Sequence, residues 1–226
     1  MITSIQLQSF KGHRDTTVPL GRLTVLVGPN GTGKTSVLQA LSLMARLMTD
    51  EPGKVLRGDM RLPDLLRRTE QEPITLTTQP SLNRVGNKVF IDFHGAPDVP
   101  AHGASEGTLI TLALLTALCS PNRPRLLLLD DIDQSLHPQA QMELMGELKR
   151  LLEGFPEVQL VATTHSPYIL DALEPSDVRV FAPRKDGSVA CRSLSEHPQA
   201  EKMRGALTAG QLWSLDPEWR WVVGER

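Results

Sequence analysis

Short apolar runs alternate along the chain with longer segments in which apolar residues recur at helical spacing. The runs predict strands, and the helical spacing predicts amphipathic helices. The expected strands are residues 2–10, 15–20, 23–27, 126–129, 158–163, 178–181 and 189–194, with a hairpin at 74–78 and 88–93. The expected helices are residues 36–48, 106–118 and 138–152, with one short helix around 62–68. Strands that alternate with helices favour an α/β fold with a mainly parallel sheet and crossover helices.

The pattern shows no repeat and no long linker, so we expect a single domain over residues 1–226. Within it, residues 1–20 and 74–93 should form a small antiparallel β flap. A helix over residues 104–119 should precede the second half of the sheet. Residues 198–226 form a tail that holds all three tryptophans of the chain. This tail either caps the core or offers a docking surface to a partner.

One loop carries the strongest chemical signal. Residues Gly28–Thr35 have the form GxxxxGK[ST], and they stand between an expected strand and an expected helix. This is the P-loop, in which glycines let backbone N–H groups converge on phosphates and the helix N-terminus faces the same anion. Lys34 would reach the β- and γ-phosphates, and the Thr35 hydroxyl would bind Mg²⁺. The residues expected around the nucleotide are Asn30, Gly31, Thr32, Gly33, Lys34, Thr35 and Ser36.

A second signal follows the apolar run Leu126–Leu129, which we expect to be a strand buried on both faces beside the P-loop. It ends in Asp130 and Asp131, the arrangement of a Walker B motif. A carboxylate at that strand tip can hold Mg²⁺, a role that fits Asp130. Asp131 stands where many such enzymes place the carboxylate that orients the attacking water. The alternative is a strand that merely ends in solvated acids.

Two further segments are ambiguous when taken alone. Ser105 precedes Glu106 at the start of an expected helix, which is also ordinary helix capping. His165 follows the expected strand at 158–163, and an isolated histidine is more often structural than catalytic. Its position at a strand tip nevertheless matches where ligand sites lie in α/β folds.

Composition restricts the remaining choices. Of the 226 residues, 40% are hydrophobic and 22% are charged, and the net charge is −2. This balance gives no overall basic footprint for nucleic acid, although small clusters such as Arg67–Arg68 leave a local contact open. No apolar run reaches membrane-spanning length, and the N-terminus does not look like a signal peptide. Cys119 and Cys191 are not spaced as metal ligands, so we expect reduced thiols and a cytoplasmic location.

Taken in order, these motifs resemble the ABC-type ATPase heads of the RecF, SMC and OLD group, in the subfamily of AAA-type ATP-binding proteins without a coiled-coil insertion. The similarity extends over nearly the whole chain. The segments that carry it are Phe10–His13, Gly28–Thr35, Ser105–Thr108, Asp130–Asp133, Ser135–Pro138, Thr164–Pro167 and Gly210–Trp213. They correspond in turn to the first strand end, Walker A, the signature, Walker B, the D-loop, the switch histidine and a C-terminal element.

The resemblance implies an ATPase that uses ATP and Mg²⁺ and dimerises on ATP. Ser105 and Gly107 of one subunit would contact the γ-phosphate bound to the other, and His165 would sense that phosphate within its own subunit. Lys34 and Asp131 would complete the catalytic set. ATP would close a homodimer and hydrolysis would release it, so that the chain regulates or powers a separate effector protein.

Three features depart from the family pattern. Asp131 replaces the usual Glu, and its side chain is one methylene shorter. Either it orients water poorly and hydrolysis is slow, or the backbone has shifted to bring it into place. No Gln clearly marks the Q-loop, for which Gln79 is a weak candidate. The absence of a coiled-coil insertion excludes long-armed DNA-tethering architectures.

Three functional readings therefore stay open. The first is a dimeric ATPase switch acting on a separate protein, and relatives of this kind serve in anti-phage defence or DNA maintenance. The second is an ATP-gated binding module that hardly hydrolyses ATP. The third is the ATPase subunit of a membrane transporter, which the Ser105–Thr108 signature disfavours.

Overall fold

The computed structural model describes residues 1–48, 75–80, 110, 113–114, 116–118, 120, 123–134 and 136–224, and gives only the backbone for 75–80. The strands are β1 (Ile2–Phe10), β2 (His13–Pro19), β3 (Leu23–Val27), β4 (Thr75–Pro80), β5 (Leu126–Leu129), β6 (Gln159–Thr163), β7 (Val178–Pro183) and β8 (Val189–Ser193). The main helices are α1 (Lys34–Leu47), α5 (Pro138–Gly154), α6 (Pro167–Asp171), α7 (Ala209–Leu215) and α8 (Glu218–Trp221). The bounds of the strands and of α1 and α5 agree closely with the expected ones, whereas the short helices α6, α7 and α8 were not predicted.

The larger sheet has five strands in the order β5-β6-β3-β7-β8. The first four are parallel, and β8 pairs antiparallel with β7. All five residues of β3 are buried, as expected for a central strand covered on both faces. The loop that follows β3 therefore leaves the middle of the sheet at its carboxyl edge, where ligand sites of α/β folds lie.

One expectation about β5 is wrong. The strand is separated from the P-loop strand β3 by β6, which pairs with both. It is not the fully buried strand that we expected: among its four leucines only Leu127 is buried, and the other three are half-buried. A run of leucines fits a partly buried strand at the edge of the described sheet as well as a central one, so composition alone could not separate the two.

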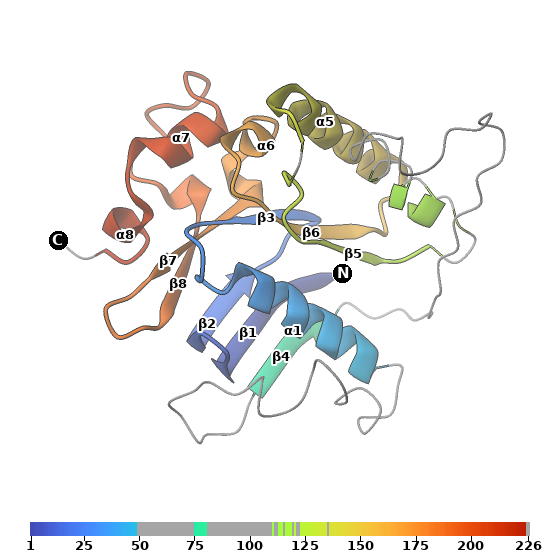
Figure 1. The fold of residues 1–226 in the computed structure, drawn as a ribbon, viewed down its shortest axis with the longest axis horizontal. Helices are drawn as coiled ribbons and strands as arrows, with labels where there is room; N and C mark the ends of the chain where they lie inside the picture. Colours follow the sequence, from blue (N-terminus) through green and yellow to red (C-terminus); the bar gives the residue numbers. More distant parts are fainter. Residues whose placement is uncertain are drawn as a thin grey trace.

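The flap is a three-stranded antiparallel sheet in the order β2-β1-β4. Its expected first two strands and the first half of the predicted hairpin are confirmed, whereas residues 88–93 lie outside the described part of the chain. Figure 1 shows α1 between this flap and the larger sheet. The three layers share one apolar cluster, in which Ile5 and Phe10 of β1 meet Leu41 of α1 and Phe181 of β7.

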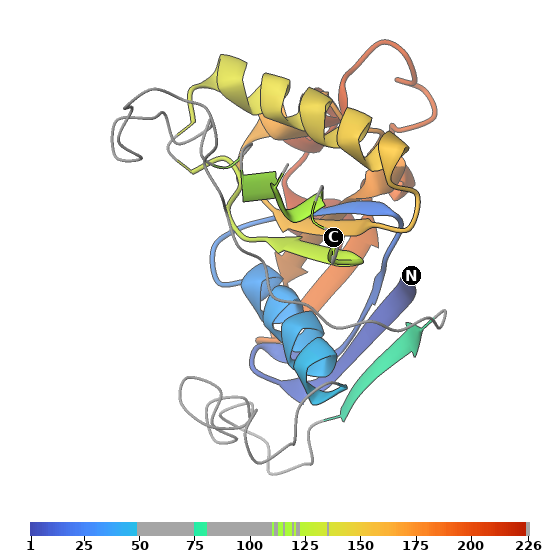
Figure 2. The same ribbon diagram turned by 90° about the vertical axis from the view of Figure 1, so that its right-hand side faces the viewer.

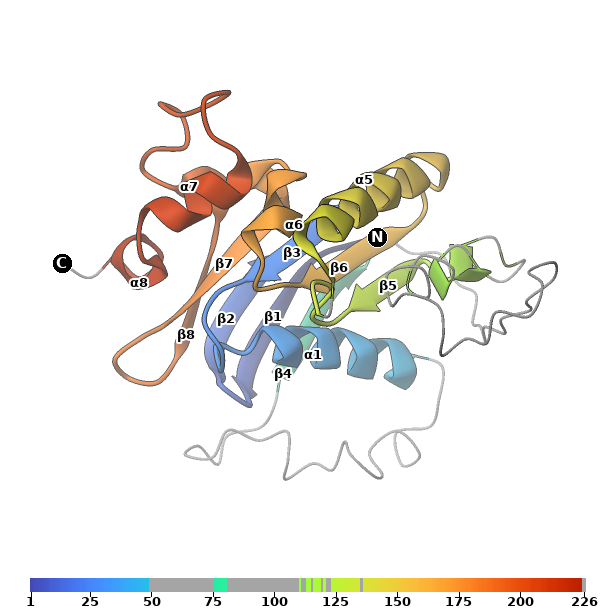
Figure 3. The ribbon, with the colours of Figure 1, turned by 45° about the horizontal axis from the view of Figure 1, so that its top comes forward.

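The opposite face of the larger sheet is covered by α5, α6, α7 and α8, as the edge-on view in Figure 2 and the tilted view in Figure 3 show. The tail is part of this core: Leu212 and Trp221 are buried, and Trp213 packs against the same cluster. Trp219 alone of the three tryptophans is exposed, at 54%. The tail therefore caps the core, the first of the two roles open to it.

Several predicted features fall on undescribed residues. Of the helix expected at 106–118, positions 110, 113–114 and 116–118 are helical, and Leu114 and Leu118 join the core. Ser105, Gly107 and the helix expected at 62–68 lie outside the described residues, as does the side chain of Gln79. Within the described part of the chain, no helix combines the length and apolar character needed to cross a membrane.

Candidate functional site

The P-loop has a backbone that only glycine adopts readily. Gly28, Gly31 and Gly33 have φ angles of 140°, 78° and 80°. At Gly28 space is lacking as well, because a Cβ would stand 2.3 Å from the carbonyl oxygen of Phe181 in β7. Gly33 then occupies the N-cap position of α1. Left-handed residues in such a loop turn its N–H groups toward one concavity, the geometry that gathers them on a phosphate.

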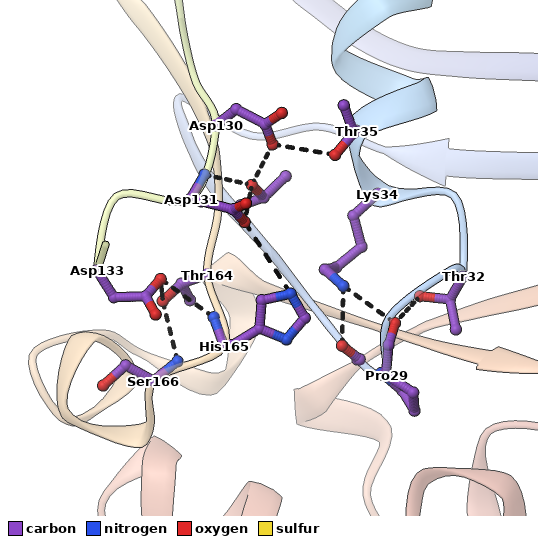
Figure 4. A network of polar contacts seen from close by, with 12 residues as sticks. Pro29, Thr32, Lys34, Thr35, Asp130, Asp131, Asp133, Thr164, His165 and Ser166 are labelled. Carbon is purple, nitrogen blue, oxygen red and sulfur yellow. Dashed lines mark hydrogen bonds and ion pairs between the residues drawn. The ribbon is translucent and has the colours of Figure 1, made fainter. Parts of the chain in front are cut away.

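Lys34 lies under this loop with its charge turned inward. Its side chain is buried, and Nζ donates hydrogen bonds to the carbonyl oxygens of Gly28 at 2.9 Å and Pro29 at 3.1 Å (Figure 4). Burial lowers the pKa of Lys34, while the carboxylates of Asp131 and Asp130 oppose that change. The ammonium group thus stands beside the P-loop, bonded there to neutral carbonyl acceptors. Phosphate oxygens would accept stronger, charge-assisted bonds.

The loop rests on a residue that the sequence pattern did not single out for a role. His13 of β2 is fully buried, and its Nε2 lies 3.1 Å from the carbonyl oxygen of Gly33. A carbonyl oxygen only accepts, so Nε2 carries a proton and donates it to this bond. Burial lowers the pKa of His13, which favours the neutral imidazole. The position of His13 at the end of the Phe10–His13 segment was the available signal.

This contact makes a first prediction about two glycines with matching backbones. A Cβ on Gly33 would come within 2.4 Å of His13 Nε2, whereas a Cβ on Gly31 would meet nothing within 4 Å. Gly31→Ala should cost only the left-handed backbone strain, about 1–2 kcal/mol in unfolding free energy. Gly33→Ala should cost clearly more, because the buried imidazole must move. Denaturant unfolding of both variants measures the difference, and equal costs would contradict the contact.

The acidic tip of β5 reaches the P-loop despite the intervening strand. Thr35 Oγ1 donates to Asp130 Oδ1 at 3.2 Å, so the residues expected to hold Mg²⁺ already face each other (Figure 4). A hydroxyl and a carboxylate are hard oxygen donors of the kind that Mg²⁺ prefers, together with water and phosphate oxygens. These two residues therefore fit a magnesium ion bound beside the nucleotide.

Asp131 faces His165 across the mouth of the site. Asp131 Oδ1 lies 4.0 Å from His165 Nε2, and the two side chains are 48% and 38% exposed. Asp131 also has a φ of 48°, a left-handed backbone that is uncommon for a residue with a side chain. Such outliers gather at functional sites, where surrounding contacts hold them. The two residues predicted to orient water and to sense the γ-phosphate thus lie together next to the loop.

A second set of contacts joins the loop after β5 to the loop after β6. Asp133 Oδ1 accepts hydrogen bonds from Thr164 Oγ1 at 2.5 Å and from the backbone N–H of His165 at 3.2 Å. Gln141 of α5 donates to the carbonyl oxygen of Leu136 at 2.8 Å and accepts from Ser166 Oγ. The histidine is therefore held by the same loop that carries Asp131. Sequence reasoning assigned no role to these partners.

The structure thus brings five of the predicted site residues together. Lys34, Thr35, Asp130, Asp131 and His165 form one cluster at the carboxyl edge of β3, β5 and β6. Of the other P-loop positions, Thr32 is buried with its hydroxyl on the Pro29 carbonyl oxygen at 2.8 Å, Asn30 and Gly31 are exposed, and Ser36 is half-buried. Ser105 and Gly107 cannot be placed, since neither is among the described residues.

Fold and site together define an ABC-type ATPase head with a P-loop. More narrowly, the chain belongs to the family described as "AAA domain, putative AbiEii toxin, Type IV TA system", which matches residues 53–171, just over half of its length. Residues 1–52 match a second family, described as "AAA ATPase domain".

Similar proteins include import ATPases and a Septu protein. The chain is 28% identical to the "Putative 2-aminoethylphosphonate import ATP-binding protein PhnT" of Salmonella choleraesuis, over 80% of this chain and 55% of that protein. It is 29% identical to the zinc import ATP-binding protein ZnuC of Pseudomonas savastanoi, over 64% of this chain and 57% of that protein. It is 30% identical to Septu protein PtuA of Bacillus mycoides, over 45% of this chain and 15% of that protein. The chain thus spans about half the length of the import proteins that it matches.

Two solved structures have the same fold. The SMC head bound to the C-winged helix domain of ScpA superposes with a TM-score of 0.59 at 13% identity, over 89% of this chain and 99% of that one. The SMC head domain from Thermotoga maritima superposes with a TM-score of 0.54 at 18% identity, over 85% of this chain and 98% of that one. At such low identity the likeness concerns the fold alone.

Proposed function

We propose that this protein hydrolyses ATP, with Lys34 and the P-loop binding the phosphates and Asp131 orienting the attacking water. The observation that carries this proposal is the meeting of Lys34, the Thr35–Asp130 pair and the Asp131–His165 pair in one cluster. The water oxygen would bond to the γ-phosphorus while the bond to the β–γ bridging oxygen breaks, which yields ADP and phosphate. Asp131 would accept a hydrogen bond from that water, and His165 would donate to the γ-phosphate.

A magnesium ion would be held by Thr35 and Asp130. It would supply positive charge that stabilises the phosphate oxygens of the transition state. The remaining work belongs to the protein, since the P-loop backbone and Lys34 hold the phosphates in place. Positioning and electrostatic stabilisation are the main contributions to phosphoryl transfer.

The direct test measures ATP binding and phosphate release by the purified wild-type protein. We expect Mg²⁺-dependent hydrolysis that stops when EDTA is added. If the protein binds ATP without releasing phosphate over many hours, it is an ATP-gated binding module, and the proposed hydrolysis is wrong. If it binds no ATP at all, the nucleotide site itself is wrong.

We further propose that ATP closes a homodimer in which Ser105 and Gly107 complete the partner's site. The ordered set of ABC-type motifs supports this proposal, because in that architecture the signature is remote from the P-loop of its own subunit. Ser105→Arg should therefore abolish ATP-dependent dimerisation while the monomer still binds ATP. Sedimentation with and without ATP measures this, with Ser120→Arg at the far end of the same segment as control. Equal dimerisation of wild type and Ser105→Arg would exclude the signature from the interface.

We propose that the switch acts on a separate effector protein, in anti-phage defence. The similarity to Septu protein PtuA supports this direction, and the similarity to import ATPases supports a transporter subunit as the second candidate. These two candidate functions differ in the partner that the protein would bind, a separate effector protein or a membrane subunit. Phage plating on a host carrying this gene with its native neighbours, with and without Lys34→Ala, tests the first. Co-purification with a membrane subunit would instead establish the second.

A further inference from the structure

Thr163, the last residue of β6, occupies the centre of the acidic cluster. Its side chain is fully buried, and β6 places it between the P-loop strand β3 and the acidic strand β5. The single atom Oγ1 lies 2.5 Å from Asp130 Oδ1, 3.3 Å from Asp131 Oδ1 and 2.8 Å from the backbone nitrogen of Asp131. One hydroxyl therefore touches both the predicted magnesium ligand and the predicted water-orienting residue.

The donors and acceptors at this hydroxyl can be assigned. A threonine hydroxyl has one hydrogen to donate and lone pairs that accept. The backbone N–H of Asp131 can only donate, so Oγ1 accepts from it and gives its own hydrogen to a carboxylate. The 2.5 Å distance selects Asp130, and Asp131 Oδ1 remains the longer contact. Thr163 thus holds the carboxylate of Asp130 and, at the same time, the backbone of Asp131.

This backbone contact matters because Asp131 is the residue with the left-handed φ of 48°. Such a conformation costs free energy, and it persists only where neighbouring contacts fix it. The accepted N–H at 2.8 Å is one such contact, and the bond from the N–H of Ile132 to the carbonyl oxygen of Thr163 at 3.1 Å is another. The end of β6 therefore determines the direction in which the short Asp131 side chain leaves the chain.

We propose that Thr163 is a positioning residue for ATP hydrolysis: its hydroxyl holds Asp130 and Asp131 in the arrangement that lets an aspartate orient the attacking water. This inference rests on the proposed ATPase function. The proposed contribution comes from the hydroxyl group of Thr163 and not from the volume of its side chain. Valine has nearly the same shape, so Thr163→Val removes the hydroxyl while it still fills the site.

The chain offers a matched control in Thr24, a fully buried threonine in the neighbouring strand β3. Its Oγ1 accepts the backbone N–H of Gly21 at 2.9 Å, away from the acidic cluster. Thr24→Val therefore makes the same chemical change in the same sheet without touching the site. Thr163→Ser serves as the second control, because serine restores the hydroxyl.

The experiment measures kcat by phosphate release and the Kd for a fluorescent ATP analogue in wild type, Thr163→Val, Thr163→Ser and Thr24→Val. Rates are normalised to the number of nucleotide sites titrated, which removes any loss of folded protein. We expect Thr163→Val to lower kcat by roughly ten- to a hundredfold, since a misplacement of about 1 Å has effects of that size. Its Kd should change by less than about threefold, because the P-loop is untouched. Thr163→Ser should recover most of the rate.

Two results would overturn the inference. The first is a Thr163→Val protein that hydrolyses ATP as fast as wild type. The second is an equal fall in normalised kcat for Thr163→Val and Thr24→Val, which would mean that any buried threonine of the sheet matters as much. A wild-type protein that binds but does not hydrolyse ATP would be a failure of the proposed function itself. That outcome is recognised before any variant is compared.

Discussion

Lys34→Ala is expected to lower ATP hydrolysis by at least about a hundredfold and to weaken ATP binding. The ammonium group stands buried beside the P-loop, within 2.9 Å of the Gly28 carbonyl oxygen and 3.1 Å of the Pro29 carbonyl oxygen. Hydrogen bonds to charged groups contribute about 1.5–3 kcal/mol each. Two such bonds to phosphate oxygens amount to about 3 kcal/mol or more, which is roughly a hundredfold in rate.

The measurement is steady-state phosphate release together with the Kd for ATP. Lys202→Ala is the matched control, since Lys202 is an exposed lysine in the turns before α7. Because Lys34→Ala also removes two bonds to the loop carbonyls, both assays are run well below the melting temperature of the variant. Unchanged Kd and unchanged rate in Lys34→Ala would refute the phosphate-binding role of the loop.

Local patterns predicted much of this molecule because they depend on neighbouring residues. The run Leu23–Val27 could be recognised as a buried strand, and Gly28–Thr35 as its loop, since each glycine is required by a local backbone angle. The helix after Pro138 was predicted in the same way, and a proline does stand at its first turn. The strand–loop–helix context was then enough to propose the phosphate-binding residues without any knowledge of the sheet.

Strand order could not be predicted in this manner. The strand β6 pairs with β5, which comes before it in the chain, and also with β3, which lies more than a hundred residues away, and no local pattern records that second pairing. For the same reason the roles of His13, Thr163 and Asp133 were missed. Each of these three residues contacts a partner from another strand or loop, which is Gly33 for His13, Asp130 for Thr163 and Thr164 for Asp133. Motif reasoning proposes the residues that would touch the ligand, but the residues that contact and support them emerge only from the packed structure.

The carboxylate of Asp131 is expected to be essential for hydrolysis, although its side chain is one methylene shorter than that of glutamate. Asp131→Asn should lower kcat by roughly a hundredfold or more, because the amide lacks the charge of a carboxylate and cannot serve as base. It should also prolong any ATP-closed dimer, since phosphate is formed more slowly. Asp15→Asn on the exposed face of the flap strand β2 provides a matched control. An Asp131→Asn protein with the wild-type rate would mean that Asp131 has no part in the reaction.

Asp131→Glu distinguishes between the two explanations for the shorter side chain. If the aspartate is simply too short, the added methylene should accelerate hydrolysis. The structure favours the other outcome, because Thr163 and the φ of 48° hold the backbone in a position of its own, from which a longer side chain would overreach. We therefore expect Asp131→Glu to be slower than wild type, by less than Asp131→Asn. Steady-state phosphate release decides, and a faster Asp131→Glu protein would mean that the left-handed turn does not bring the aspartate to the water.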